Sequence, residues 1–249
     1  MKNSLASRLV TANNAVPCST ESKFSFPSLS CDLKLSELTC LVGPHRAQLR
    51  VYLLMLAGLL KSKQGEVCVL GQKVCELDPL AWQSFRSQIG YISGIAPSLS
   101  SQHALMNVML PLLYHLNLPF RDAADKARAL LTNLECDFEP TMYPAKLDGF
   151  QRGQLALARA LILDPSLLIM DVPFNDLGAK DRQKMAELLG KHKLNRAVCM
   201  IGGLQYPRFL EQHASQVIFI SEYQIIHFNG WASFSQSEDK EVQALLNTF

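Results

Sequence analysis

The sequence predicts an α/β protein in which helices cover both faces of a mainly parallel sheet. Three observations support this prediction. From Glu37 onward, short apolar runs alternate with longer segments that have helical periodicity. Several of the short runs are apolar at every position, which is typical of strands buried on both faces of a sheet. Hydrophobic residues make up 48% of the 249 residues, so the chain can bury a large core.

Each expected strand is a short apolar run that stops at a turn or at a polar residue. The first ends at Gly43-Pro44, and the fourth ends at Asp171. The last two runs are close enough along the chain to form a hairpin. The expected strands cover residues 38–42, 65–71, 89–92, 167–170, 197–201, 217–220 and 225–228.

The expected helices repeat apolar residues every three or four positions. The clearest of them has Leu155, Ala158 and Leu161 on one face. It stops at Asp164-Pro165, because the residue before a proline disfavours helical geometry. The expected helices cover residues 49–60, 105–118, 123–134, 151–163 and 179–193.

Charge and composition exclude two broad classes of protein. Lys and Arg number 24 against 22 Asp and Glu, which gives a formal net charge of +2. This balance excludes a disordered, highly charged chain and a strongly basic nucleic-acid binder, so no nucleic acid is expected as a partner. The 13 glycines are roughly 5% of the chain, against a usual ~7%. The chain therefore has slightly fewer glycines than usual.

The cysteines and the apolar runs predict a cytoplasmic protein. The seven cysteines are odd in number and have no C-x-x-C spacing. They therefore fit small hydrophobic residues in a reducing compartment better than a zinc or redox motif. Residues 1–22 lack the apolar stretch of a secretory signal and are expected to form a flexible tail. The longest apolar run, 51–60, is about half of a membrane span.

The segment after the first strand lies where a phosphate-binding loop would be. Such a loop has the pattern G-x-x-x-x-G-K-[ST], in which backbone N–H groups wrap the phosphates, the lysine reaches the outer phosphates and the hydroxyl holds Mg²⁺. Here the first glycine is present, but Gln48, Leu49 and Arg50 replace the second glycine, the lysine and the hydroxyl. The whole segment is Gly43, Pro44, His45, Arg46, Ala47, Gln48, Leu49 and Arg50.

The order and spacing of the remaining motifs resembles the ATP-binding cassette (ABC) ATPase of transporters from about residue 24 to 228. The most specific part lies within LDGFQRGQLALARALILDPSLLIMDVPF at 147–174, where an ARAL helix is followed by Asp-Pro, an apolar strand and Asp171. The resemblance implies a P-loop NTPase (RecA-like) core with a parallel sheet, an antiparallel β subdomain and an α-helical subdomain at about 95–150. It places the ATP-binding domain at 23–234 and a C-terminal helix at 235–249.

The resemblance also assigns roles to single residues. Asp171 keeps the position that binds Mg²⁺, but Val172 follows it in place of the catalytic glutamate. The switch histidine falls at about Gly203 and the glutamine of the Q-loop at Gly94. Residues 175–178 replace the D-loop. The signature LSGGQ is replaced by Leu147, Asp148, Gly149, Phe150 and Gln151, and the Asp148 carboxylate is expected to repel the γ-phosphate bound by a partner subunit.

These replacements predict a degenerate, hydrolysis-deficient subunit. The resemblance implies that it docks on a permease, or regulates it, at the cytoplasmic face of the membrane. The resemblance implies ATP and Mg²⁺ as ligands, a transmembrane permease as partner, and a homodimer or a heterodimer with a second ABC subunit. Losing the lysine weakens nucleotide binding about 10- to 100-fold, and losing a positioned base costs about 10²–10⁴ in rate. Three alternatives stay open: an active ATPase with divergent motifs, an interaction module outside transport, and phosphate binding by Arg46 or Arg50.

Two features are similar to the ATPase of Mla-type phospholipid transporters. One is Pro173-Phe174 after the acidic strand end, and the other is the tail 237–246, which resembles that branch's terminal helix. In that branch the helix reaches the neighbouring subunit. The alternative is an ordinary end helix that packs on its own domain. Lipoprotein- and amino-acid-type branches also stay open.

Overall fold

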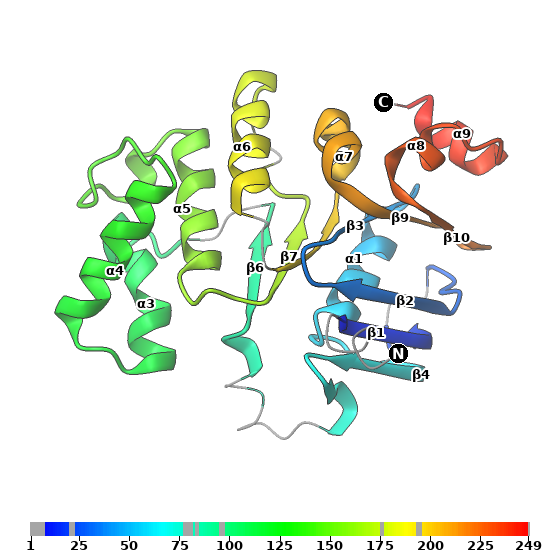
Figure 1. Cartoon of the computed structure of the whole chain (residues 1–249), viewed down its shortest axis with the longest axis horizontal. Helices are drawn as coiled ribbons and strands as arrows, with labels where there is room; N and C mark the ends of the chain where they lie inside the picture. The colour runs from blue at the N-terminus through cyan, green and yellow to red at the C-terminus, as the bar shows by residue number, and fades with distance from the viewer. Residues whose placement is uncertain are drawn as a thin grey trace. The chain divides into compact units, whose positions relative to one another are not determined.

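The structure is a computed structural model that describes residues 8–19, 23–76, 82, 85–94, 98–174, 177–192 and 196–248. Figure 1 labels most of its helices and strands, which are numbered in chain order. The chain divides into two compact units. The first consists of residues 1–78 and 193–249, and the second of residues 79–192. No helix in the described part of the chain is long and apolar enough to cross a membrane.

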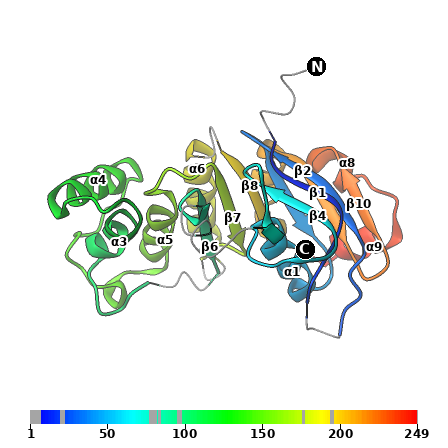
Figure 2. The ribbon, with the colours of Figure 1, turned by 90° about the horizontal axis from the view of Figure 1, so that it is seen from below.

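The first unit contains a parallel strand arrangement and a separate antiparallel sheet. In the parallel part, β3 lies between β8 and β9, and β10 pairs with β9 as the expected antiparallel hairpin. The antiparallel sheet has the order β2-β1-β4-β5, and Figure 2 shows β1, β2 and β4 side by side. The strands are β1 (Arg8–Pro17), β2 (Leu29–Lys34), β3 (Leu38–Val42), β4 (Ser62–Val69), β5 (Gln72–Lys73), β8 (Ala197–Ile201), β9 (Ala214–Ile220) and β10 (Ile225–Phe228).

Strand β1 corrects the expectation of a flexible tail over residues 1–22. It pairs with β2 on one side and β4 on the other, so neighbouring strands satisfy its backbone groups. Val10, Ala12 and Ala15 are buried in the core. The sequence RLVTANNAVP has few strong strand formers, which is why its pattern predicts no strand. Residues 1–7 and 20–22 of the expected tail lie outside the described residues.

The sequence pattern does not predict two helices of the first unit, α7 (Pro207–His213) and α8 (Gly230–Ser235), and it predicts α1 with different ends. Helix α1 begins at Arg46, three positions before the expected start, and ends at Leu56. Gly58 then takes a positive φ of 71°, a conformation that glycine adopts without strain and that stops the helix. The helices of this unit are α1 (Arg46–Leu56), α7 (Pro207–His213), α8 (Gly230–Ser235) and α9 (Lys240–Leu246), with short 3-10 turns at Val74–Glu76 and Gly203–Gln205.

The C-terminal helix packs on its own unit. Val242 is fully buried and Leu245 is 9% exposed, so the apolar stripe of α9 faces the chain to which it belongs. The Ser221 hydroxyl donates a hydrogen bond of 2.9 Å to Glu241 Oε2 at the start of this helix. This arrangement corresponds to the ordinary end helix that the sequence left open as an alternative.

Within its described residues, the second unit combines two parallel strands with four helices. Strands β6 and β7 pair in parallel, and α5 packs on β6. Gly90 permits this packing, because a Cβ there would lie 2.6 Å from the backbone oxygen of Ala160. Helix α3 packs against α4 and α5. The elements are β6 (Ile89–Ser93), α3 (Ala104–Leu116), α4 (Phe120–Asn133), a 3-10 turn (Pro144–Lys146), α5 (Gly149–Leu161), β7 (Leu167–Asp171) and α6 (Ala179–His192).

Candidate functional site

The loop between β3 and α1 keeps its first glycine for a steric reason. A Cβ on Gly43 would lie only 2.1 Å from the backbone oxygen of Ile220, so no larger residue fits against the end of β9. Residues 44–47 are exposed. His45 occupies the N-cap position of α1, and its side chain makes no capping hydrogen bond. Arg46 follows as the first residue of the helix.

Gln48 fills the position of the second glycine with a buried side chain. It is 0% exposed. Its Nε2 donates hydrogen bonds to the backbone oxygen of Ser25, at 2.7 Å, and to that of Ser221, at 3.1 Å. Gln48 therefore joins the first turn of α1 to two segments that are distant in sequence. In a phosphate-binding loop, this position has no side chain at all.

Leu49 occupies the position of the phosphate-binding lysine. It is 5% exposed, and its Cδ2 atom lies 3.3 Å from the place that a Cβ on Gly43 would take. The side chain thus packs into the core next to the loop and carries no charge. Arg46 and Arg50 are exposed on α1, one helical turn apart, so the cations of this segment lie on its surface.

The segment 24–27 lies along the beginning of α1, and we call it the α1 strap. The Phe24 ring lies 5.2 Å from the His45 ring, and the Phe26 ring lies 5.9 Å from the Tyr52 ring, measured between centroids. The Tyr52 hydroxyl donates a hydrogen bond to the Pro27 oxygen, and burial raises the pKa of Tyr52. Together with the Ser25–Gln48 bond, these contacts cover the first two turns of α1.

The signature segment forms the N-terminal cap of α5. The Asp148 carboxylate accepts a hydrogen bond of 2.8 Å from the Gln151 N–H, and Gln151 Oε1 accepts one of 3.1 Å from the Asp148 N–H. Gln151 Nε2 also donates to Asp137 at 3.1 Å. The Asp148 carboxylate thus lies at the positive end of its own helix, and its expected repulsion of a phosphate on a partner subunit stays a prediction. Leu147 is buried, and Lys184 lies 5.4 Å from the centre of the Phe150 ring.

The acidic end of β7 holds one carboxylate and then apolar side chains. Asp171 is 3% exposed, and its Oδ2 accepts a hydrogen bond of 3.3 Å from the Tyr91 hydroxyl on β6. Val172, at the position of the catalytic glutamate, is 4% exposed and has a φ of 47°. This left-handed conformation is strained for a β-branched residue. The described residues contain no group of three His, Cys, Asp or Glu side chains that could hold a metal ion.

The position of the switch histidine has no space for a side chain. Gly203 is buried, and a Cβ there would lie 2.5 Å from Cys40 Sγ and 3.1 Å from Leu210 Cδ2. Gly94, at the position of the Q-loop glutamine, follows the end of β6. At the D-loop position, Leu177 is buried, whereas residues 175 and 176 lie outside the described residues.

Sequence reasoning missed several residues that shape this site. Neither the α1 strap nor the link through Ser221 follows from a local pattern, because the partners are 23 and 173 residues from Gln48. The sequence does contain a signal for the helix cap at Asp148. An Asp followed three positions later by Gln is close to the capping-box pattern that starts many helices.

The fold and the order of its motifs define an α/β cassette of the nucleotide-binding class, with the expected loop, signature and acidic strand end in sequence. A family model described as ABC transporter matches residues 27–175, which is more than half of the chain. The chain therefore belongs to the ABC transporter family.

Two similar relatives are ATP-binding proteins of bacterial transport systems. The lipoprotein-releasing system ATP-binding protein LolD of Chromohalobacter salexigens is 33% identical over 151 residues, or 60% of this chain and 63% of that protein. The methionine import ATP-binding protein MetN of Latilactobacillus sakei is 28% identical over 77% of this chain and 60% of that protein. In both comparisons the chain spans less than two thirds of the relative.

Solved structures share the fold over most of the chain. The dimeric structure of MJ0796, a bacterial ABC transporter cassette, has a TM-score of 0.74 and 21% identity over 87% of this chain and 97% of that one. The structure of cbiO1 from Clostridium perfringens, part of the ABC transporter complex cbiONQ, has a TM-score of 0.79 and 16% identity. It covers 97% of this chain and 95% of that one.

Proposed function

We propose that this chain is a cassette subunit of a membrane transport system that docks on a permease, or regulates it, without hydrolysing ATP. Membership of the ABC transporter family and the relatives named for lipoprotein release and methionine import support the transport role. By analogy with the dimeric cassette, we propose that it pairs with a second copy or with another ABC subunit at the inner face of the membrane.

The proposed loss of hydrolysis rests on one observation, the packing of the phosphate loop. Gln48 and Leu49 are both buried, so the loop presents neither the lysine nor the open backbone that a triphosphate requires. The residues present do not fit ATP with Mg²⁺. Catalysis of phosphoryl transfer depends on positioning and on neutralising charge, and the loop supplies no cation at the lysine position.

The other replacements support the same proposal. Val172 offers no base, and Gly203 has no room for a histidine. The N-terminus of α5 is capped by Asp148, so its dipole is already paired with a negative charge. In a dimer of two such chains, each nucleotide site would therefore combine an impaired loop from one subunit with an impaired signature from the other.

The test is a calorimetric titration of the purified full chain with ATP, carried out with and without Mg²⁺. We expect the dissociation constant for ATP to lie above about one micromolar, and we expect Mg²⁺ to leave it unchanged. Sub-micromolar binding, or ATP turnover that disappears in Asp171→Ala, would support the active ATPase with divergent motifs instead. Phosphate gripped by Arg46 or Arg50 would give weak binding that is lost in the double Arg46→Gln, Arg50→Gln variant.

The membrane partner is tested by co-purification from membranes of the host. A permease, with or without a second ABC subunit, supports the transport role, and the absence of both supports an interaction module outside transport. Lipid as the cargo stays a prediction. The tail that suggested the phospholipid branch packs on its own unit, so the cargo must be identified from the permease that co-purifies.

A further inference from the structure

The turn that joins β9 to β10, residues 221–224, contacts the start of α1 and the start of α9, and we call it the β9–β10 turn. The Ser221 N–H donates to the Gln224 oxygen at 3.0 Å, and the Gln224 N–H donates to the Ser221 hydroxyl at 3.2 Å. Ser221 is 2% exposed. The turn and both helices belong to the first unit, so their contacts do not depend on how the two units are placed.

On one side the β9–β10 turn contacts the phosphate loop. The backbone oxygen of Ser221 accepts the hydrogen bond of 3.1 Å from Gln48 Nε2. Glu222 Oε1 lies 3.9 Å from Nε2 of His45, the N-cap residue of α1. The place of the turn therefore determines whether Gln48 keeps one of its two acceptors.

On the other side the β9–β10 turn is held by α9. The Ser221 hydroxyl donates to Glu241 Oε2 at 2.9 Å, and Gln224 Nε2 donates to the same oxygen at 3.0 Å. Gln224 Nε2 also donates to Asp239 Oδ2 at 3.2 Å. Asp239 caps α9, because its Oδ1 accepts from the N–H groups of Glu241 and Val242. The carboxylates at the start of α9 thus also hold the turn.

The buried Gln48 side chain depends on these outside contacts. Its Oε1 atom has no hydrogen-bond partner among the described residues. A buried acceptor without a donor costs free energy, because it has lost its bonds to water. Two neighbours hold the amide of this side chain in place, namely the α1 strap through Ser25 and the β9–β10 turn through Ser221. Loss of either neighbour should favour a state in which Gln48 leaves the core.

We propose that docking of α9 and closure of the phosphate loop are coupled, so that release of α9 frees the β9–β10 turn and Gln48 and opens the start of α1. The coupling runs through one residue, because the Ser221 hydroxyl bonds to α9 and the Ser221 oxygen bonds to Gln48. Such coupling is reciprocal, so opening of the loop also loosens α9. A partner that binds α9 only after its release would therefore open the loop.

The coupling goes beyond the proposed function. It concerns contacts within the first unit and holds whether or not the loop takes a nucleotide. The test accordingly uses the purified full chain without nucleotide, and its readout is amide hydrogen exchange at single residues. ATP binding or turnover would contradict the loss of hydrolysis and leave this result unchanged.

The first arm releases α9 and observes α1. The probe is the Leu49 N–H, which donates to the His45 oxygen at 3.1 Å in the first turn of α1. Val242→Asp places a charge at a fully buried position of α9 and should release the helix. We expect the Leu49 amide to exchange about tenfold faster, because local opening controls exchange and coupling of this kind is typically about 5- to 150-fold.

The second arm removes only the link. Glu241→Ala deletes the carboxylate that accepts from Ser221 and Gln224. Since a hydrogen bond contributes a factor of about two to ten, Leu49 should exchange faster by about that factor. Glu238→Ala is the matched control, because Glu238 is exposed just before α9 and takes no part in the bonds described above. It should leave the exchange of Leu49 unchanged.

The third arm runs in the opposite direction. Gln48→Ala removes the donor to the Ser221 oxygen. The probe is the Gln243 N–H, which donates to the Asp239 oxygen at 2.9 Å in the first turn of α9. Reciprocity predicts that Gln243 exchanges faster by about two- to tenfold in this variant.

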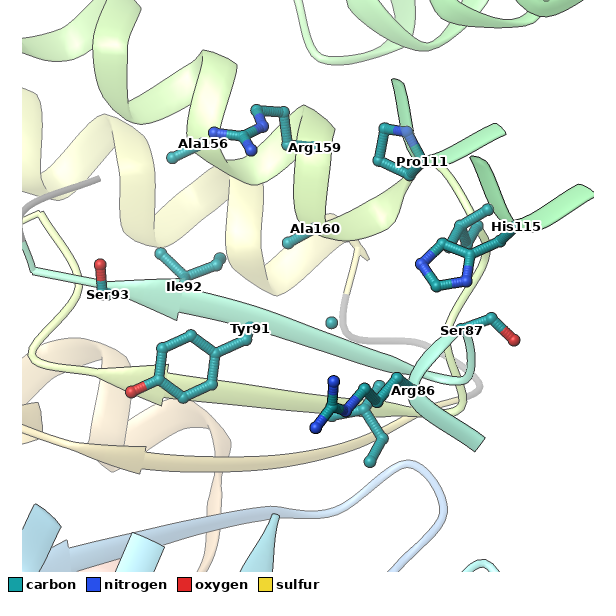
Figure 3. Close-up of a pocket in the computed structure, with 13 residues that line it drawn as sticks. Arg86, Ser87, Tyr91, Ile92, Ser93, Pro111, His115, Ala156, Arg159 and Ala160 are labelled. Atoms are coloured by element: carbon teal, nitrogen blue, oxygen red, sulfur yellow. The ribbon is translucent and has the colours of Figure 1, made fainter. Parts of the chain in front are cut away.

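The second unit supplies the internal reference. Figure 3 shows Ile92 on β6 and Ala160 on the helix above it, α5, and both residues belong to that unit. Their amides should exchange at the same rate in every variant. If Val242→Asp speeds exchange through the whole first unit, α7 included, Glu241→Ala decides the test. Unchanged exchange of Leu49 in Glu241→Ala, or an equal increase in Glu238→Ala, overturns the proposal and leaves the α1 strap as the element that holds the loop closed.

Discussion

The side-chain amide of Gln48 donates a hydrogen bond of 3.1 Å to the backbone oxygen of Ser221, although the two residues are 173 positions apart. The hydroxyl of the same serine donates to Glu241 on α9. A polar chain thus runs from the phosphate-loop position through the turn between β9 and β10 to the C-terminal helix. A residue that replaces a glycine of a ligand-binding loop has become part of the packing of the first unit.

Gln48→Ala is expected to destabilise the protein. The variant leaves the backbone oxygens of Ser25 and Ser221 without their donor, and a buried unsatisfied group costs about 1–3 kcal/mol. For a chain of this size we expect the melting temperature to fall by about 2–4 °C per kcal/mol. Gln183→Ala is the control, because that glutamine is exposed on α6 and its variant should shift stability by less than about 0.5 kcal/mol. Equal shifts would show that the Gln48 bonds contribute nothing.

Gly203→Ala is expected to lower stability without affecting the fold of the second unit. Its Cβ would meet Cys40 Sγ at 2.5 Å, and overpacking of this kind costs about 1–3 kcal/mol. A histidine at this position is larger than alanine and should lower stability further. Gly178→Ala has nothing within 4 Å of the new Cβ and should be neutral in urea unfolding. A neutral Gly203→Ala would mean that β3 and α7 move apart easily.

Asp148→Ala is expected to cost about 1 kcal/mol, because it removes the N-cap of α5. Asp148→Ser should cost little, because serine is also a good N-cap. Asp125→Ala, on the exposed face of α4, serves as the control and should change stability by less than about 0.5 kcal/mol. Chemical denaturation of the three variants is the measurement. An equal loss in Asp148→Ala and Asp148→Ser would contradict the capping role.

The sequence predicts the parts of this fold that have a strong local pattern. Strands β3 and β8 are apolar at almost every position and were placed at their observed bounds. Strand β1 was missed, because Asn13 and Asn14 interrupt its apolar alternation. The neighbours that hold β1 come from β2 and β4, and no local pattern contains them.

In the site too, local motifs can be predicted from the sequence, whereas contacts between residues far apart in the chain cannot. Motif spacing locates the phosphate loop, the signature and Asp171 in the chain. It does not reveal that Gln48 is buried, because Ser25 and Ser221 approach it only in the folded unit. For Asp148, local helix chemistry predicts the observed cap, whereas a role toward a phosphate on a partner subunit stays a prediction.

Thiol labelling is expected to distinguish the exposed Cys18 from three buried cysteines. Cys18 is exposed, whereas burial raises the pKa of Cys31 and of Cys40 to about 12 and that of Cys199 well above its ordinary value. Because the thiolate is the reactive form, a thiol reagent at pH 8 should label Cys18 quickly and these three only after denaturation. Fast native labelling of Cys40 would show that the first unit opens readily.

Acid is expected to release the C-terminal helix through Asp239, its N-cap. The Val242 N–H donates to this carboxylate and lowers its pKa, and hydrogen bonds from Gln224 and from the Glu241 N–H act in the same direction. A lowered folded-state pKa contributes stability above the unfolded value of about 3.9, and this contribution is lost as the pH falls through the folded value. The amide proton shift of Val242, followed by NMR, should therefore titrate with a midpoint below the ordinary aspartate range. Asp239→Asn, which caps without titrating, should remove this transition and keep α9 folded. A midpoint at or above the ordinary value would show that the cap does not hold the helix.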